Sequence, residues 1–214
     1  MTTGPLDPHS RPFPRLLLAA LLGAAIVFVG AAAFLTLELR EGPRGVARSL
    51  LGSAIGGPFD LVDQDGNRVS DRDLRGRWLI VYFGYTHCPD ACPTALNNIA
   101  LAVQRLGGPL RTAIRPVFIT IDPARDTPRV MKDYVAAFDA PILALTGTAA
   151  QVAQAAKAYR VYYAQHAEPG GNYSLDHTSV IYVIDPKGRF APSLASDVMP
   201  AQMAERLKQL LGQD

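Results

Sequence analysis

The chain has 214 residues, of which 49% are hydrophobic and 19% charged, and its formal net charge is +2. This composition is typical of one globular domain with an additional segment, and it excludes a wholly disordered polypeptide. With 21 basic and 19 acidic residues and no basic stripe, the sequence gives no electrostatic case for binding nucleic acid, and we expect no nucleic-acid partner.

Residues 16–37 form an apolar run without a charged residue. As a helix the run would span about 33 Å, which matches a bilayer hydrocarbon core of about 30 Å. It predicts a transmembrane anchor, and the alternative is a signal peptide cleaved near the small residues 31–33. Arginines flank the run on both sides, so they do not decide its orientation. The predicted organisation is a cytoplasmic tail at 1–15, the anchor at 16–37, a linker at 38–57 and a globular domain at 58–214.

Within the predicted domain, short apolar segments alternate with segments of helical periodicity. The predicted strands are 59–62 and 68–70, joined as a hairpin around Asp65-Gly66-Asn67, then 78–83, 116–121, 142–145 and 178–184. The predicted helices run from Pro93 to the glycines at 107–108, onward from Thr127-Pro128, over 149–159 and over 199–211. Strands that alternate with helices predict an α/β fold, with a mixed central sheet flanked by helices.

The chain contains two cysteines, Cys88 and Cys92, between the predicted strand 78–83 and the helix expected from Pro93. Open α/β folds place their sites at such carboxyl ends of strands. Pro93 fits the first helical position, so Cys92 is expected at or beside the N-cap, where the helix end stabilises a thiolate. Because a cross-link closing so short a loop adds little stability, reactive thiols are favoured over an inert disulfide.

Three residues separate the cysteines, whereas a thioredoxin-type redox pair normally has two between them. A structural zinc site would need four ligands. Two thiolates with one imidazole suit a low-coordinate Cu(I) ion, because sulfur donors favour soft metals. Among the histidines, His9 lies in the tail, His166 in an expected exposed loop, and the ring of His87 is expected to point away. His177 precedes the strand 178–184, but composition alone leaves open whether it is a ligand or an ordinary loop histidine.

Four motifs in this order resemble the signature of the Sco/SenC family of copper-binding proteins. They are YFGYTHCPDACP at 82–93, IDPARDTP at 121–128, LTGT at 145–148, and DHTS at 176–179 running into YVIDPKG at 182–188. The resemblance runs from the region of Gly56 to Leu211, and an N-terminal membrane anchor is also usual in that family.

This resemblance implies a thioredoxin-like fold that holds one Cu(I) or Cu(II) ion through Cys88, Cys92 and His177. It also implies delivery of copper to the binuclear copper centre of cytochrome c oxidase, whose copper-bearing subunit is then a partner. The domain is expected in the periplasm on a bacterial inner membrane, or on the mitochondrial inner membrane in a eukaryote. An oxidising compartment would convert the cysteines to a disulfide, so a thioredoxin-like reductant is a further expected partner. Another periplasmic copper chaperone is an additional candidate partner.

Two other functions fit the same side chains, although we favour a metallochaperone over an enzyme. A thiol-disulfide oxidoreductase that reduces the oxidase subunit's cysteines would need Cys88 and Cys92 but not His177. A copper or redox sensor would use all three residues. The roles of Asp122, Asp126 and Asp176 stay open between tuning the site and ordinary structural or solvated positions.

Overall fold

The computed structural model describes residues 55–212. The expected tail at 1–15, the expected anchor at 16–37 and most of the linker at 38–57 lie outside the described residues. Over the part of the chain that is described, no helix combines the length and the apolar character that a membrane crossing requires.

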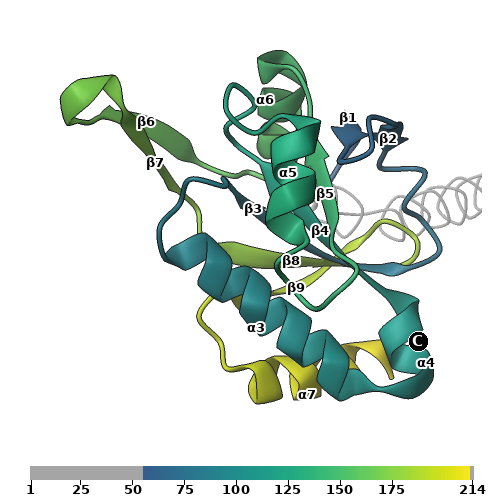
Figure 1. Cartoon of the computed structure of the whole chain (residues 1–214). Coiled ribbons are helices and arrows are strands. Elements are labelled where there is room, and N and C mark those ends of the chain that lie inside the picture. Colours follow the sequence, from purple (N-terminus) through teal and green to yellow (C-terminus); the bar gives the residue numbers. More distant parts are fainter. Residues whose placement is uncertain (1–54, 213–214) are drawn as a thin grey trace, which may run out of the picture. The chain divides into compact units, whose positions relative to one another are not determined.

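A seven-stranded mixed sheet lies at the centre, in the order β2-β1-β5-β4-β3-β8-β9 (Figure 1). Its strands are β1 (Asp60–Asp63), β2 (Arg68–Ser70), β3 (Trp78–Gly84), β4 (Ile114–Thr120), β5 (Leu143–Thr146), β8 (Val180–Ile184) and β9 (Phe190–Ala195). Strands β3, β4 and β5 are parallel neighbours, whereas β1, β2, β8 and β9 join the sheet through antiparallel pairs. The mixed sheet and the β1–β2 hairpin are therefore confirmed, and β9 is an additional edge strand that the sequence pattern does not predict.

Strand β3 lies in the middle of the sheet, between β4 and β8. All of its residues are buried, as expected for a continuous apolar run that is covered on both faces. Because β3 and β4 are parallel, the chain must cross over between them, and two consecutive helices make that crossing. The carboxyl end of β3 consequently meets the beginning of the first of these helices in the centre of the domain.

Helices cover both faces of the sheet. They are α3 (Ala91–Leu106), α4 (Gly108–Ala113), α5 (Pro128–Val135), α6 (Ala149–Ala158) and α7 (Pro200–Leu211). Gln104 of α3 donates to the backbone oxygen of Asp139, just after α5, at 2.7 Å, and α7 packs along α3 (Figure 1). Phe83 points to the opposite face of the sheet, where its ring lies 5.2 Å from that of Tyr159 at the end of α6. Helices α3, α5 and α7 thus share one face, and α6 covers the other.

Helix α3 begins earlier than the sequence predicts, at Ala91 with Asp90 as its N-cap. A proline is tolerated inside the first helical turn, because the backbone N–H that it lacks has no partner within the helix there. Pro93 is therefore the third helical residue and Cys92 the second. The expectation that Cys92 lies at or beside the N-cap is therefore wrong by one position, because Ala91 is the residue beside the cap, but the sulfur still belongs to the first turn.

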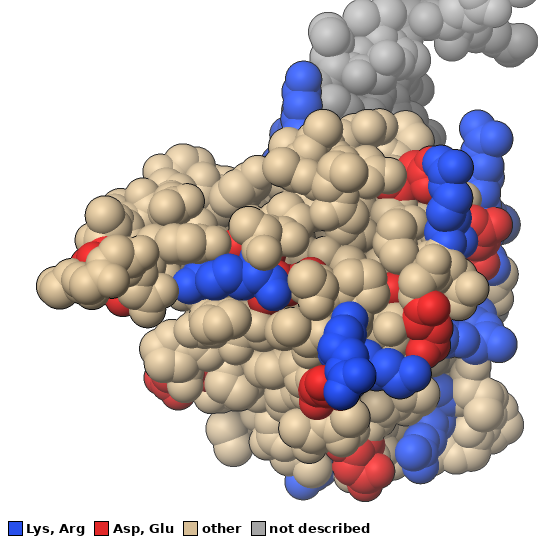
Figure 2. All heavy atoms as spheres, turned by 45° about the horizontal axis from the view of Figure 1, so that its top comes forward, with Lys and Arg blue, Asp and Glu red and all other residues tan. Residues whose placement is uncertain are grey.

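A separate two-stranded sheet projects from the domain (Figure 1). It consists of β6 (Tyr163–Ala167) and β7 (Tyr173–His177), joined by a short helical turn at Pro169–Gly171. The prediction of a loop around His166 is wrong, because this residue pairs with Ser174 in the ladder, although its side chain is exposed as expected. On the face drawn in Figure 2, this projecting part is mostly uncharged, whereas basic and acidic side chains are interspersed over the remainder.

Candidate metal centre

The cysteine loop connects the end of β3 to the beginning of α3. The Cys88 N–H donates to the Tyr85 carbonyl at 3.3 Å, so the chain turns sharply before the first sulfur. Cys88 is partly exposed and Cys92 is completely buried, and both are free thiols. The two sulfurs therefore lie together at the carboxyl edge of the sheet, one facing solvent and one facing the core.

His177, the last residue of β7, brings an imidazole to these sulfurs from the other end of the sequence. Its Nε2 lies 3.6 Å from the Cys92 Sγ, and the three donor atoms of Cys88, Cys92 and His177 lie within 4.8 Å of one another. Tyr82 and Tyr85 pack edge-on against the imidazole, with ring centroids 6.0 and 6.2 Å away. The structure thus brings together the three side chains that the sequence singles out.

A hydrogen bond at one ring nitrogen of His177 leaves the other nitrogen directed at the sulfurs. The His177 Nδ1 lies 3.1 Å from the Thr178 carbonyl oxygen, which can only accept, so we assign the proton to Nδ1. Nε2 is then the ring nitrogen that faces the sulfurs, and it is the atom that would bind a metal ion. Asp176 does not orient this ring, because its exposed carboxylate pairs with His166 at 2.9 Å.

The two thiols titrate as one coupled pair. The Cys92 side chain donates a hydrogen bond to the Cys88 sulfur and, against the effect of burial, lowers the pKa of Cys88 to about 5. Backbone N–H groups of Cys92 and Asp90 and the nearby His177 contribute in the same direction. The hydrogen bond to Cys88, followed by burial, raises the pKa of Cys92. At neutral pH the pair therefore carries one negative charge and one shared proton.

Gly84, at the end of β3, allows the helix to approach the sheet this closely. A Cβ at this position would lie 2.6 Å from the Cys92 Sγ, and only 3.1 and 3.3 Å from the rings of Phe118 and Tyr82. Any side chain here would therefore displace the sulfur. Residue patterns alone do not predict this role, although a glycine at the end of a buried strand and just before the cysteines is a usable signal.

The remaining histidines do not join the cluster. His87 is exposed, and its Nδ1 lies 3.1 Å from the Thr86 Oγ1 and 3.9 Å from an oxygen of Asp126. The expectation that its ring points away from the sulfurs agrees with this geometry. His166 lies on the projecting hairpin, and His9 lies outside the described residues.

The donor set fits a soft ion of low coordination number. Three donors that each bind one shared ion at about 2.0–2.3 Å lie about 3.5–4.0 Å from one another. The donor atoms here all lie within 4.8 Å of one another, so only a small approach is needed to bind an ion. Among the described residues, no further histidine, cysteine or carboxylate belongs to this group, so a closed four-ligand zinc site is not formed. Two thiolates with one neutral imidazole match Cu(I) in particular.

Comparison with known proteins identifies the family. The SCO1/SenC family model matches residues 47–212. The chain belongs to the SCO1/SenC family. Saccharomyces cerevisiae "Protein SCO1, mitochondrial" is 42% identical over 143 residues, which are 66% of this chain and 48% of the yeast protein. The human "Protein SCO1 homolog, mitochondrial" is 40% identical over 153 residues, covering 71% of this chain and 50% of the relative. This SCO1/SenC chain spans about half the length of these relatives.

Solved structures of family members have the same fold. A copper-bound ScoI from Bradyrhizobium japonicum is 41% identical with a TM-score of 0.68, and the match covers 73% of this chain and 99% of that one. Copper-bound yeast Sco1 is 37% identical with a TM-score of 0.70, covering 75% and 90% of the two chains. Both the predicted family and the predicted thioredoxin-like α/β fold with a mixed sheet are thereby confirmed.

Proposed function

We propose that this protein binds one copper ion through Cys88, Cys92 and His177 and delivers it to the copper-bearing subunit of cytochrome c oxidase. The observation that carries this proposal is the convergence of two sulfurs and one imidazole nitrogen. It is supported by the copper that two related proteins hold in their solved structures, and by the resemblance to a family implicated in oxidase assembly.

The thiol pair suggests how the ion is taken up and released. Copper replaces the proton that the two sulfurs share, so binding releases this proton to solvent. Because Cys88 is partly exposed, a thiolate of an acceptor protein can approach the ion on that side and exchange for it. No change in the oxidation state of copper is required for such a ligand exchange.

We further propose that residues 16–37 anchor the chain in a bacterial inner membrane, or a mitochondrial one in a eukaryote, with the domain in the periplasm or the intermembrane space. In either compartment the cysteines oxidise without a reductant. A thioredoxin-like protein that returns them to thiols is therefore a proposed partner, and another copper chaperone is a proposed donor of the metal.

Copper titration tests the proposed ligands. The reduced full-length chain in detergent should bind one Cu(I) in competition with a chromophoric chelator. Replacing Cys88 or Cys92 by alanine should abolish binding, and His177→Ala should weaken it strongly but leave it measurable. His166→Ala is the matched control, because this exposed histidine lies outside the cluster. Wild-type affinity in the His177→Ala variant would overturn the proposed ligand set.

The lowered pKa of Cys88 favours a second candidate function, reduction of a disulfide in the oxidase subunit. The Cys88 thiolate would attack a substrate sulfur and form a mixed disulfide. Cys92 would then lose its proton and attack Cys88, which releases the substrate. Two electrons and the Cys92 proton would pass to the substrate, whose other sulfur leaves as a thiolate and takes its proton from solvent, while Cys88 and Cys92 form a disulfide. Oxidase activity in cells that carry His177→Ala as the sole copy separates the functions: it survives if reduction suffices and is lost if copper must be carried.

A further inference from the structure

The loop 122–126 lies between β4 and α5, where it touches both segments that supply the donor atoms. The Asp126 N–H donates to the Asp122 carbonyl at 2.9 Å, which closes the loop into a tight turn. Both aspartates are buried, with 4% exposure for Asp122 and none for Asp126. Buried carboxylates are retained where they are fully hydrogen-bonded, so the partners of these two show what the loop holds in place.

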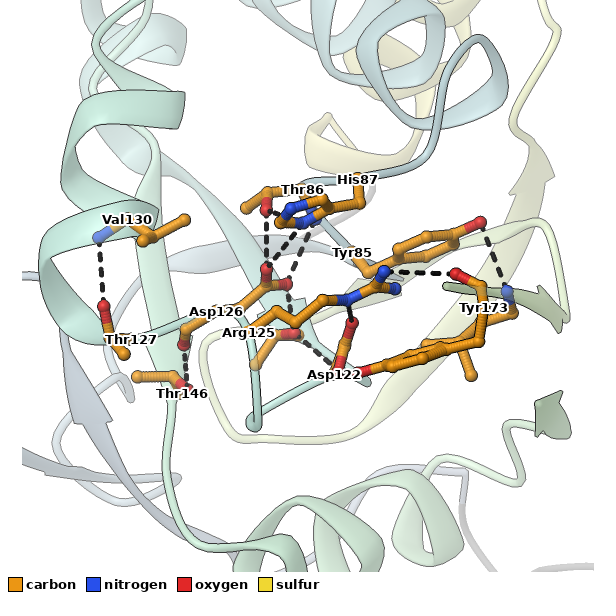
Figure 3. Close-up of polar contacts among 12 residues, drawn as sticks. Tyr85, Thr86, His87, Asp122, Arg125, Asp126, Thr127, Val130, Thr146 and Tyr173 are labelled. Atoms are coloured by element: carbon orange, nitrogen blue, oxygen red, sulfur yellow. Dashed lines mark hydrogen bonds and ion pairs between the residues drawn. The ribbon is translucent and has the colours of Figure 1, made fainter. Parts of the chain in front are cut away.

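Asp126 holds the segment that leads into the cysteines (Figure 3). Its carboxylate accepts hydrogen bonds from the Thr86 N–H at 3.1 Å, from the Thr86 hydroxyl at 2.6 Å and from the Thr120 hydroxyl at 2.6 Å. Thr86 precedes Cys88 by two residues, and Thr120 ends β4. One carboxylate therefore ties the cysteine loop to the central sheet.

The neighbouring Arg125 holds the strand that carries the histidine. Its guanidinium carbon lies 3.7 Å from the centroid of the Tyr173 ring, and its Nη1 donates to the Tyr173 carbonyl at 3.1 Å and to the Asn172 side chain at 3.2 Å. Its Nε donates to Asp122, which also accepts the Tyr173 hydroxyl at 2.8 Å. Figure 3 shows the guanidinium between the rings of Tyr85 and Tyr173. A single largely buried arginine thus binds β7 through both the backbone and the side chain of Tyr173.

Residues Tyr173, Leu175 and His177 project from the same face of β7, because side chains alternate along a strand. Tyr173 lies about 13 Å along this strand from His177, at about 3.3 Å per residue. Between them, the Leu175 N–H donates to the Tyr85 hydroxyl at 3.3 Å. Since β6 and β7 form a sheet of their own, these contacts fix the position of the hairpin relative to the domain.

We propose that Arg125 is a positioning residue that sets the distance between the His177 imidazole and the two sulfurs. The inference rests on the proposed copper-binding function and extends it to a residue outside the ligand set. Two adjacent residues of one tight turn hold the two segments: Asp126 binds the segment that leads to the sulfurs, and Arg125 binds the strand that ends at the histidine. Without the arginine, β7 loses its contacts with the turn, whereas Asp126 still ties Thr86 to the central sheet, so copper keeps both sulfurs and loses the imidazole.

A double-mutant cycle on the full-length chain in detergent tests this inference. Arg125→Met should weaken Cu(I) binding about 10–100-fold, as is typical when groups that orient metal ligands are removed. In a His177→Ala background the same substitution should have no further effect on affinity, because the imidazole is already absent. The electron paramagnetic resonance spectrum of the Cu(II) form should lose its nitrogen coupling in Arg125→Met. Tyr173→Phe, which removes only the hydroxyl bound to Asp122, should cause a smaller change of the same kind.

Arg129→Met is the matched control, because this arginine is exposed on α5 and forms an ion pair with the exposed Asp133. Its copper affinity and spectrum should equal those of the wild type. The inference is overturned if Arg125→Met behaves like this control, or if it weakens binding equally without His177.

Amide hydrogen exchange of the metal-free chain separates this inference from the proposed function. Exchange in β6 and β7 should be faster in Arg125→Met than in the wild type and in Arg129→Met. A wild type that binds no copper would refute the proposed function, and the exchange rates would still decide whether Arg125 fixes the hairpin. Unchanged exchange in Arg125→Met would refute the positioning role.

Discussion

Replacing Gly84 by alanine should damage the metal centre without touching a donor atom. The new Cβ would lie 2.6 Å from the Cys92 Sγ, whereas non-bonded heavy atoms pack about 3.5–4.0 Å apart. The buried rings of Phe118 and Tyr82, at 3.1 and 3.3 Å, block movement of the methyl group in other directions. The sulfur must therefore shift by about 1 Å, beyond the tolerance of about 0.2 Å for metal–ligand distances.

We expect Gly84→Ala to weaken Cu(I) binding about 100-fold, equivalent to about 2.7 kcal/mol, as misplacement of a functional group by about 1 Å does elsewhere. Overpacking should also lower the free energy of unfolding by about 1–3 kcal/mol. Competition with a chelator measures the affinity, and urea unfolding followed by circular dichroism measures the stability.

Gly147→Ala is the control for overpacking alone. Its Cβ would lie 3.0 Å from the side-chain oxygen of Gln151 and 3.2 Å from a methyl group of Leu61, neither of which is a proposed ligand. This variant should lose stability but keep wild-type copper affinity. If Gly84→Ala bound copper as tightly as the wild type, or if both variants lost affinity equally, the argument from close approach would be refuted.

Three further predictions concern the thiols and the packing of the helices. A lowered pKa means that the thiolate persists to lower pH, so the rate of alkylation of Cys88 by iodoacetamide should rise through about pH 5 and then level off. Cys92→Ala removes the thiol that donates to Cys88 and should move this midpoint to higher pH. A wild-type midpoint near the ordinary value of about 8.5 would contradict the hydrogen bond between the two cysteines. Leu207→Ala should lower the free energy of unfolding by about 2–5 kcal/mol, because this side chain is fully buried on α7; a loss below about 0.5 kcal/mol in urea unfolding would show that α7 is not packed as described. Thr148→Ala removes the capping box with Gln151 at the start of α6 and should cost about 1 kcal/mol in the same assay; unchanged stability would show that the cap contributes nothing.

Much of the sheet could be predicted because its signals are local. The buried run 78–84 and the turn residues around Gly66 specify their strands without help from distant segments. Strand β9 and the β6–β7 hairpin lack such signals, because their residues are mostly exposed or half-buried, form no continuous buried run and do not alternate cleanly. In these segments pairing partners, rather than intrinsic pattern, determine the structure.

The candidate site could be predicted only in part for the same reason. The cysteine loop is recognisable from its own sequence, but the position of His177 depends on the hairpin register that pairs it with Tyr163. The grip of Arg125 on Tyr173 joins residues 48 positions apart, and no local periodicity encodes it. Residue patterns therefore identify the chemistry of the donors, whereas the tertiary structure determines their distances.

The two sulfurs differ in their exposure to solvent, and this difference bears on the order in which their bonds to a metal ion can be exchanged. A molecule arriving from solvent can reach the sulfur of Cys88, but the sulfur of Cys92 is enclosed by the helix and the sheet. His177 is partly exposed as well, so the ligand exchange proposed above would begin at one of these two outer donors and finish at the inner sulfur. The last bond of a departing ion to break would then be the one that lies deepest in the protein.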